Sequence, residues 1–185
     1  MASLEVTPSG KLLCAFDKFQ HLHIFGKVKD RLRLQNSHAM PKRIFMFTVA
    51  PQIDSCEHVF VSLHDKSIRL FRIEGNTGNT LSEVASIRVV GRPRMLCWLS
   101  GQRMLLAADE NPAKHQSTFT TYKLVKSANG MRLDPLGVEV DTSMDVSCWF
   151  SRSERSLMIL DSRKWELLDL NIEGGLASSD SEDEQ

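Results

Sequence analysis

The chain has 185 residues, of which 42% are hydrophobic and 25% are charged, a composition ordinary for one globular domain with a sizeable core. Lys and Arg together number 23, as do Asp and Glu, so the formal net charge is zero, which argues against a strongly basic nucleic-acid-binding domain. No apolar stretch reaches the roughly 18–20 residues of a membrane-spanning helix, and the four cysteines form no CxxC pair, so we expect an intracellular, nuclear or cytoplasmic protein without membrane association.

Four units of similar layout follow one another along the chain. Each has an apolar strand, a short bend, a second apolar strand that ends at an Asp, and a third strand, and the segments between units supply a fourth strand. The expected units are about residues 4–40, 41–90, 91–141 and 142–173. Because a four-stranded blade occupies about 40–50 residues, this spacing predicts an all-β chain of β-propeller blades over residues 1–173.

The clearest internal repeat is CWLSGQRMLLAAD, residues 97–109, which recurs as CWFSRSERSLMILD at residues 148–161. Matching apolar runs on both sides of the bend indicate a repeated structural element rather than a repeated catalytic site. We expect Trp98 and Trp149 to fill the space between neighbouring sheets. The Asp that follows each second strand should accept hydrogen bonds from the turn backbone two residues on. These residues are Asp17, Asp65, Asp109 and Asp161.

Two segments carry a resemblance to a known family. VFVSLHDKSIRLFRIE, residues 59–74, and VTPSGKLLCAF, residues 6–16, resemble the strands and turns of a WD40-repeat blade, although no unit holds the family's Gly-His or Trp-Asp dipeptide. The resemblance implies a divergent WD40-like β-propeller of about four blades. Four blades leave three alternatives: a small closed ring, a truncation of a longer protein, or part of a propeller that a partner completes. A β-rich domain unrelated to propellers is a further alternative.

A basic segment lies between the first two units. Alternate residues of GKVKDRLRLQ are cationic and would project from one face of a strand, which predicts binding to a phosphate backbone or an acidic partner. The other interpretation is the solvated face of an edge strand, where cations deter pairing. This candidate basic interaction strip comprises Lys27, Lys29, Arg31, Arg33, Lys42 and Arg43. A candidate rim loop comprises Arg88, Arg92 and Arg94.

No catalytic, cofactor or metal site is expected. The six histidines are scattered without the spacing of metal ligands, and phosphate-binding loops and nucleophile motifs are absent. Residues 174–185 form an acidic tail that we expect to be disordered. Ser179 and Ser181 each precede an acidic residue by three positions, so both are candidate phosphorylation sites.

Two functional hypotheses follow from these observations. The first is a non-catalytic scaffold or protein-interaction subunit of an intracellular complex, with protein partners, one of which completes the propeller. The alternative is an RNA-associated accessory subunit of an RNA-modifying enzyme, because the layout of residues 66–109 is similar to that of the propeller subunit of the tRNA guanine-N7 methyltransferase. Neither hypothesis assigns enzymatic activity or a cofactor to the chain.

Overall fold

The computed structural model describes most of the chain between residues 4 and 178. The described ranges are 4–53, 55–74, 80–99, 104–111, 116–127, 130–143, 147–150, 156–160, 165–171 and 175–178. Within these ranges every regular element is a β-strand, so the all-β class predicted from the sequence is confirmed. No helix long and apolar enough to cross a membrane occurs in the described ranges.

Sixteen strands in the described ranges form four sheets, each of four antiparallel strands in consecutive order. The first sheet contains β1 (Leu4–Val6), β2 (Leu12–Phe16), β3 (His21–Val28) and β4 (Arg31–Ala39). The second contains β5 (Ile44–Ile53), β6 (Cys56–Leu63), β7 (Ser67–Glu74) and β8 (Thr80–Arg88). The third contains β9 (Arg92–Leu99), β10 (Met104–Asn111), β11 (Gln116–Ser127) and β12 (Gly130–Ser143). The fourth contains β13 (Ser147–Phe150), β14 (Ser156–Leu160), β15 (Trp165–Asn171) and β16 (Gly175–Ser178).

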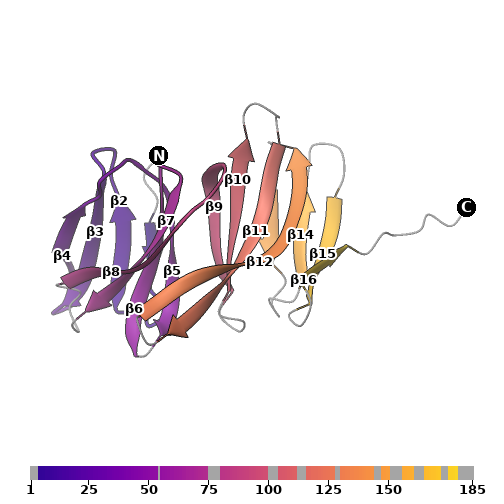
Figure 1. The fold of residues 1–185 in the computed structure, drawn as a ribbon. Helices are drawn as coiled ribbons and strands as arrows, with labels where there is room; N and C mark the ends of the chain where they lie inside the picture. The colour runs from indigo at the N-terminus through magenta and orange to yellow at the C-terminus, as the bar shows by residue number, and fades with distance from the viewer. Residues whose placement is uncertain are drawn as a thin grey trace, which may run out of the picture.

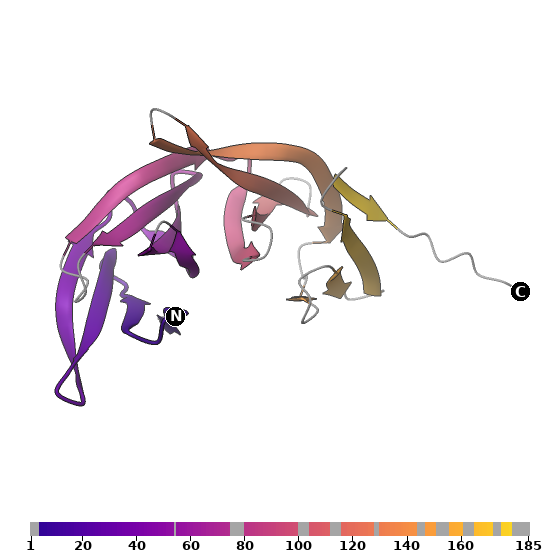
Figure 2. The ribbon, with the colours of Figure 1, turned by 90° about the horizontal axis from the view of Figure 1, so that it is seen from below.

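The four sheets follow one another along an open arc (Figures 1 and 2). The first strand of each sheet lies toward the concave side and the last strand toward the convex side, with the first and fourth sheets at the two ends (Figure 2). The described sheets therefore do not close into a propeller ring. Strand β16 lies inside the segment expected to be a tail, and residues 179–185, including Ser179 and Ser181, lie outside the described residues.

Alternating burial shows which face of the first sheet packs. Leu12, Cys14 and Phe16 are buried on β2, whereas the residues between them are only half-buried. Leu22 and Ile24 on β3 join the same buried face, which packs on the second sheet. A strand with one buried face is expected to alternate in this way, because successive side chains point to opposite sides.

The second sheet is buried on both faces because it lies between two others. Along β6, Val59 and Val61 pack toward the first sheet while Phe60 packs toward the third. The Phe60 and Trp98 rings stack with centroids 5.1 Å apart, and Trp98 is buried. This confirms the expectation that Trp98 fills the space between neighbouring sheets. Trp149 lies in β13, where no side chains are described.

Four Asp residues were expected to accept hydrogen bonds from turn backbone, and the structure describes the side chains of two of them, Asp17 and Asp65. Both make the expected bonds. The Asp17 carboxylate accepts hydrogen bonds from the backbone N–H of Phe19 at 2.8 Å and of His21 at 3.0 Å. The Asp65 carboxylate accepts from the Ser67 backbone N–H at 3.1 Å and from its hydroxyl. These bonds explain why an Asp follows the second strand in each of these two sheets.

Candidate functional site

The predicted basic strip is a hairpin rather than one strand. Lys29 and Asp30 are the two turn residues between β3 and β4, both with positive φ, 48° and 63°. Lys27 pairs with Leu32 and therefore shares its face, whereas Arg31 pairs with Val28 on the opposite face. The expectation that these cations project from one face is wrong, because the turn reverses the chain in the middle of the pattern.

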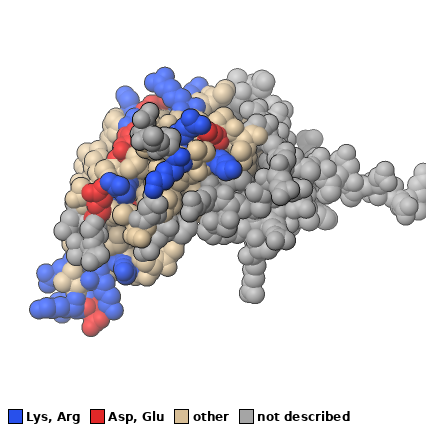
Figure 3. All heavy atoms as spheres, turned by 60° about the horizontal axis from the view of Figure 1, so that its bottom comes forward, with Lys and Arg blue, Asp and Glu red and all other residues tan. Residues whose placement is uncertain are grey.

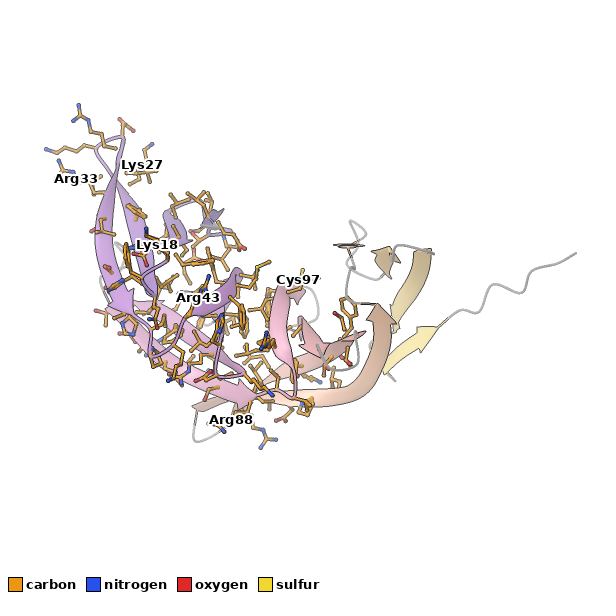
Figure 4. All side chains as sticks on the ribbon, turned by 90° about the horizontal axis from the view of Figure 1, so that it is seen from above. Lys18, Lys27, Arg33, Arg43, Arg88 and Cys97 are labelled. Carbon is orange, nitrogen blue, oxygen red and sulfur yellow. The ribbon has the colours of Figure 1, made fainter. Side chains whose placement is uncertain are left out.

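The cations of this hairpin gather at a protruding tip (Figure 3), and Figure 4 shows Lys27 and Arg33 on different sides of it. Lys42 and Arg43 do not join them. They follow β4, which has nine residues and therefore spans about 30 Å at ~3.4 Å per residue. The structure thus divides the predicted strip between opposite ends of the first sheet, and phosphate binding at the tip stays a prediction.

A second group of cations lies at what we call the crossing end, formed by the β2–β3 and β6–β7 turns and by the links between successive sheets. Backbone hydrogen bonds bring these turns and links together. Gln20 accepts one from Met40 N–H at 2.8 Å, and Arg43 accepts one from His64 N–H at 2.9 Å. Figure 4 looks down on the molecule and shows Lys18 and Arg43 over the packed sheets, with Arg88 at the outer edge.

His64 is the central residue of this group. Its imidazole stacks on the Phe45 ring with centroids 3.8 Å apart and the planes 16° from parallel, which fixes the ring while leaving the residue exposed. Loss of solvent, followed by the charges of Arg43 and Arg92, lowers the pKa of His64 below its usual value. His64 is therefore a neutral imidazole within the electrostatic reach of Arg43, in the β4–β5 link, and of Arg92, the first residue of β9.

Such an arrangement has two chemical capacities. A neutral imidazole can accept a proton from water or a hydroxyl group. Guanidinium groups beside it can bind an anion, or stabilise negative charge that develops during a reaction. We call His64, Arg43 and Arg92 the His64 site.

Asp65 anchors the turn that carries His64. Burial alone would raise the pKa of Asp65, but its hydrogen bonds from Ser67 and the charges of Arg69 and Arg88 lower it below the usual value. Arg69 approaches the Asp65 carboxylate at 3.5 Å. An ionised, hydrogen-bonded Asp65 therefore fixes the turn on which His64 sits.

The predicted candidate residues contribute unequally to this site. The charges of Arg43, from the basic strip, and of Arg92 act on His64, and that of Arg88 acts on Asp65. The three arginines expected in a rim loop lie in strands instead, because Arg88 ends β8 and β9 already begins at Arg92. The side chain of Arg94 lies outside what the structure describes. Sequence reasoning missed His64 because its neighbours in the site come from positions 21 and 28 residues away, so no motif connects them.

His23 and Cys14 are two other potentially reactive side chains, and both are less accessible than His64. On the first sheet, His23 contacts the Asp17 carboxylate at 3.0 Å through Nε2, and its Nδ1 is buried, so neither nitrogen is open to a substrate. Between the first two sheets, burial, followed by the charges of Glu5 and Glu57, raises the pKa of the Cys14 thiol to about 12, which makes it a poor nucleophile. Across the described part of the chain, no group of three or more His, Cys, Asp or Glu side chains is arranged to hold a metal ion.

The chain is similar to known proteins in its structure but not in its sequence. No family model matches the chain, and no curated protein matches its sequence. Among solved structures, a protein of Bacteroides uniformis provisionally named a 6-phosphogluconolactonase aligns with a TM-score of 0.74 at 14% identity, covering 95% of this chain and 52% of that one. A Bacteroides fragilis protein with the same provisional name aligns with a TM-score of 0.72 at 15% identity, covering 95% and 52%. A protein of unknown function from Desulfotomaculum acetoxidans aligns with a TM-score of 0.73 at 13% identity, covering 97% and 55%.

These similarities establish a shared fold, and the chain spans about half the length of these neighbours. They overturn the resemblance to WD40-repeat proteins, because the neighbours carry a different name and the sheets do not close. They also overturn the expectations of a non-catalytic scaffold, of an RNA-associated accessory subunit and of a chain without enzymatic activity, since two of the neighbours bear the name of an enzyme. The WD40 match was wrong because short strands joined by Pro, Gly and Asp turns are common to many sheet proteins.

Proposed function

We propose that this chain belongs to a lactone hydrolase that acts on a phosphorylated sugar lactone, and that the His64 site carries the reaction. The observation that supports the proposal most directly is the neutral imidazole of His64 beside Arg43 and Arg92. The fold that the chain shares with two proteins provisionally named 6-phosphogluconolactonases supplies the substrate class. The two guanidinium groups suit a substrate that carries a phosphoryl group.

The proposed reaction is acid–base hydrolysis. Water attacks the lactone carbonyl carbon while His64 accepts one of its protons, and the carbonyl oxygen becomes an oxyanion that the guanidinium charges stabilise. The tetrahedral intermediate then collapses as the bond between the carbonyl carbon and the ring oxygen breaks. The imidazolium of His64 donates its proton to the departing oxygen, which leaves a hydroxy acid and restores the neutral imidazole.

The test measures hydrolysis of the δ-lactone of 6-phosphogluconate by the purified full chain, with the rate of the uncatalysed reaction subtracted. Wild-type protein should accelerate the reaction, and His64→Gln should lower the rate by about 10²–10⁴-fold, the usual contribution of a general base. Arg43→Ala should lower kcat/KM, because it removes one of the two positive charges that the proposal places at the reacting lactone. The matched control is His38→Gln, since His38 lies on β4 and contacts the Phe71 ring, 5.8 Å away between centroids.

The pH dependence provides an independent readout. Because the pKa of His64 lies below its usual value, the base stays neutral in mildly acidic solution, and the rate should persist to lower pH than for an unperturbed histidine. A wild-type chain that gives no rate above the uncatalysed reaction would contradict the proposal. So would a His64→Gln variant that matches wild type.

A further inference from the structure

The first sheet has one face that nothing in the described chain covers. Register pairs Val6 with Leu13, Leu13 with Phe25, and Phe25 with Leu34, so these side chains lie on the same face across β1 to β4. Leu4 and Leu32 lie on this face as well, paired with Ala15 and Lys27. We call this surface the free face. It comprises Leu4, Val6, Leu13, Phe25, Leu32 and Leu34.

The exposure of these side chains is unusual for a sheet in a folded protein. Leu4 is 62% exposed, Val6 55%, Leu32 60% and Leu34 53%. Scattered exposed apolar residues are normal, but a contiguous set across four neighbouring strands is typical of a surface that another protein covers. The opposite face of the two central strands, β2 and β3, is packed on the second sheet.

The way the sheets pack within the chain indicates what covers the free face. The second sheet is covered on one side by the first sheet and on the other by the third, each through an apolar cluster. The free face is an apolar sheet face of the same kind, at the end of the arc (Figure 2). A further four-stranded sheet would therefore continue the packing already present in the chain.

The structural neighbours are about twice as long as the part that this chain matches. The structural alignment includes 95% of this chain but only 52% of each of the two Bacteroides neighbours. Two copies would supply about that full length. In Figure 2 the fourth sheet lies at the opposite end of the arc from the first, so two arcs placed end to end would each contribute the sheet that the other lacks.

We propose that the free face binds the fourth sheet of a second copy of this chain, so that two copies form a closed dimer with two equivalent contacts. Closure limits the assembly to two copies, because each contact joins different surfaces and the second contact closes the ring. The charged hairpin tip and the Asp17–His23 pair border the apolar strands, which gives the polar rim and apolar centre of a protein–protein interface. The inference does not depend on the proposed hydrolase activity.

The test is the mass of the purified full chain by light scattering and sedimentation over a hundredfold range of concentration. Wild-type protein should have the mass of a dimer, and Val6→Glu combined with Leu34→Glu should have the mass of a monomer. Both residues are more than half exposed, so the substitutions should leave the monomer folded, which circular dichroism checks. The matched control is Val90→Glu, because Val90 is 86% exposed but lies in the β8–β9 link, and this variant should remain a dimer.

Three results would overturn the proposal. They are a wild-type chain that is monomeric at every concentration, a double variant that remains a dimer, and a mass that grows with concentration beyond two copies. The readout is mass alone, so the failure of the lactone assay would leave this result unchanged. Conversely, a monomer would leave the hydrolase proposal to be judged on its own assay.

Discussion

Replacing Asp17 with Asn should destabilise the chain by an amount that depends on pH. The Asp17 carboxylate accepts hydrogen bonds from two backbone N–H groups and contacts the His23 ring at 3.0 Å. The bond from the His21 N–H, followed by those from His23 and Phe19, lowers the pKa of Asp17 to about 2, and partial burial opposes this only in part. Asn keeps a carbonyl oxygen for the backbone but loses the charge, so the variant isolates what the ionised group contributes.

The magnitude follows from the pKa. A carboxyl held at about 2 in the folded chain, against 3.8 for its ordinary value, corresponds to an upper limit of about 2.5 kcal/mol. Because 30% of the side chain is exposed, solvent screening should reduce this to about 1 kcal/mol. The folded-state pKa is the lower one, so the stabilisation is complete above about pH 5 and is lost as the pH falls toward 2. About half of it should remain at pH 3.

The assay is urea unfolding of wild type and Asp17→Asn at pH 7, 5, 4 and 3. The difference in the free energy of unfolding should be constant from pH 7 to 5 and shrink by about half at pH 3. Asp30→Asn is the control, because Asp30 is 91% exposed and pairs with Lys27 across the hairpin turn, so its effect should stay below about 0.5 kcal/mol. An Asp17 effect that is independent of pH, or no larger than that of Asp30, would refute the reasoning.

Three further changes test the packing and turn geometry. Trp98→Ala should lower the free energy of unfolding in urea by about 3–5 kcal/mol, because it removes the ring that stacks on Phe60 between the second and third sheets. A decrease below about 1 kcal/mol would show that the sheets do not pack there. Replacing Lys29-Asp30 with Asn-Gly should raise the free energy of unfolding by about 0.5–1 kcal/mol, since both positions have positive φ; a loss of stability would contradict the turn geometry. Cys14, whose pKa is raised to about 12, should resist alkylation at pH 8 until urea unfolds the chain, as mass spectrometry of its peptide can show, and rapid labelling of the folded chain would contradict its burial.

Much of the fold was predictable because it follows from local patterns. Strands of alternating burial, Asp residues at turns and a Trp between sheets are each set by residues within a few positions of one another, and all three are found. The hairpin was not predicted because its turn, Lys29-Asp30, contains no Gly or Pro and continues the alternation of the flanking strands. The alternating pattern fits one long strand as well as a hairpin, and the pairing of β3 with β4 is what makes it a hairpin.

The candidate site was less accessible than the fold from sequence alone. Arg43, His64 and Arg92 were each visible as residues, but they are separated by whole strands. They come together only because the β4–β5 link, the β6–β7 turn and the start of β9 lie at the same end of the sheets. Their proximity depends on how sheets stack, which no motif encodes. The functional class was missed for a related reason, because strand rhythm is shared by scaffolds and enzymes alike.

The consecutive order of strands within each sheet has a consequence for how the chain acquires its structure during synthesis. Each strand pairs with its successor, so the first sheet can form once about 40 residues have left the ribosome. The second sheet must bury both faces, and one of them is covered only when the third sheet follows. Folding should therefore advance from the N-terminus, with each sheet completed after the next one has begun to be synthesised. While the ribosome completes the third sheet, the uncovered face of the second sheet around Phe60 should be the surface most prone to premature association.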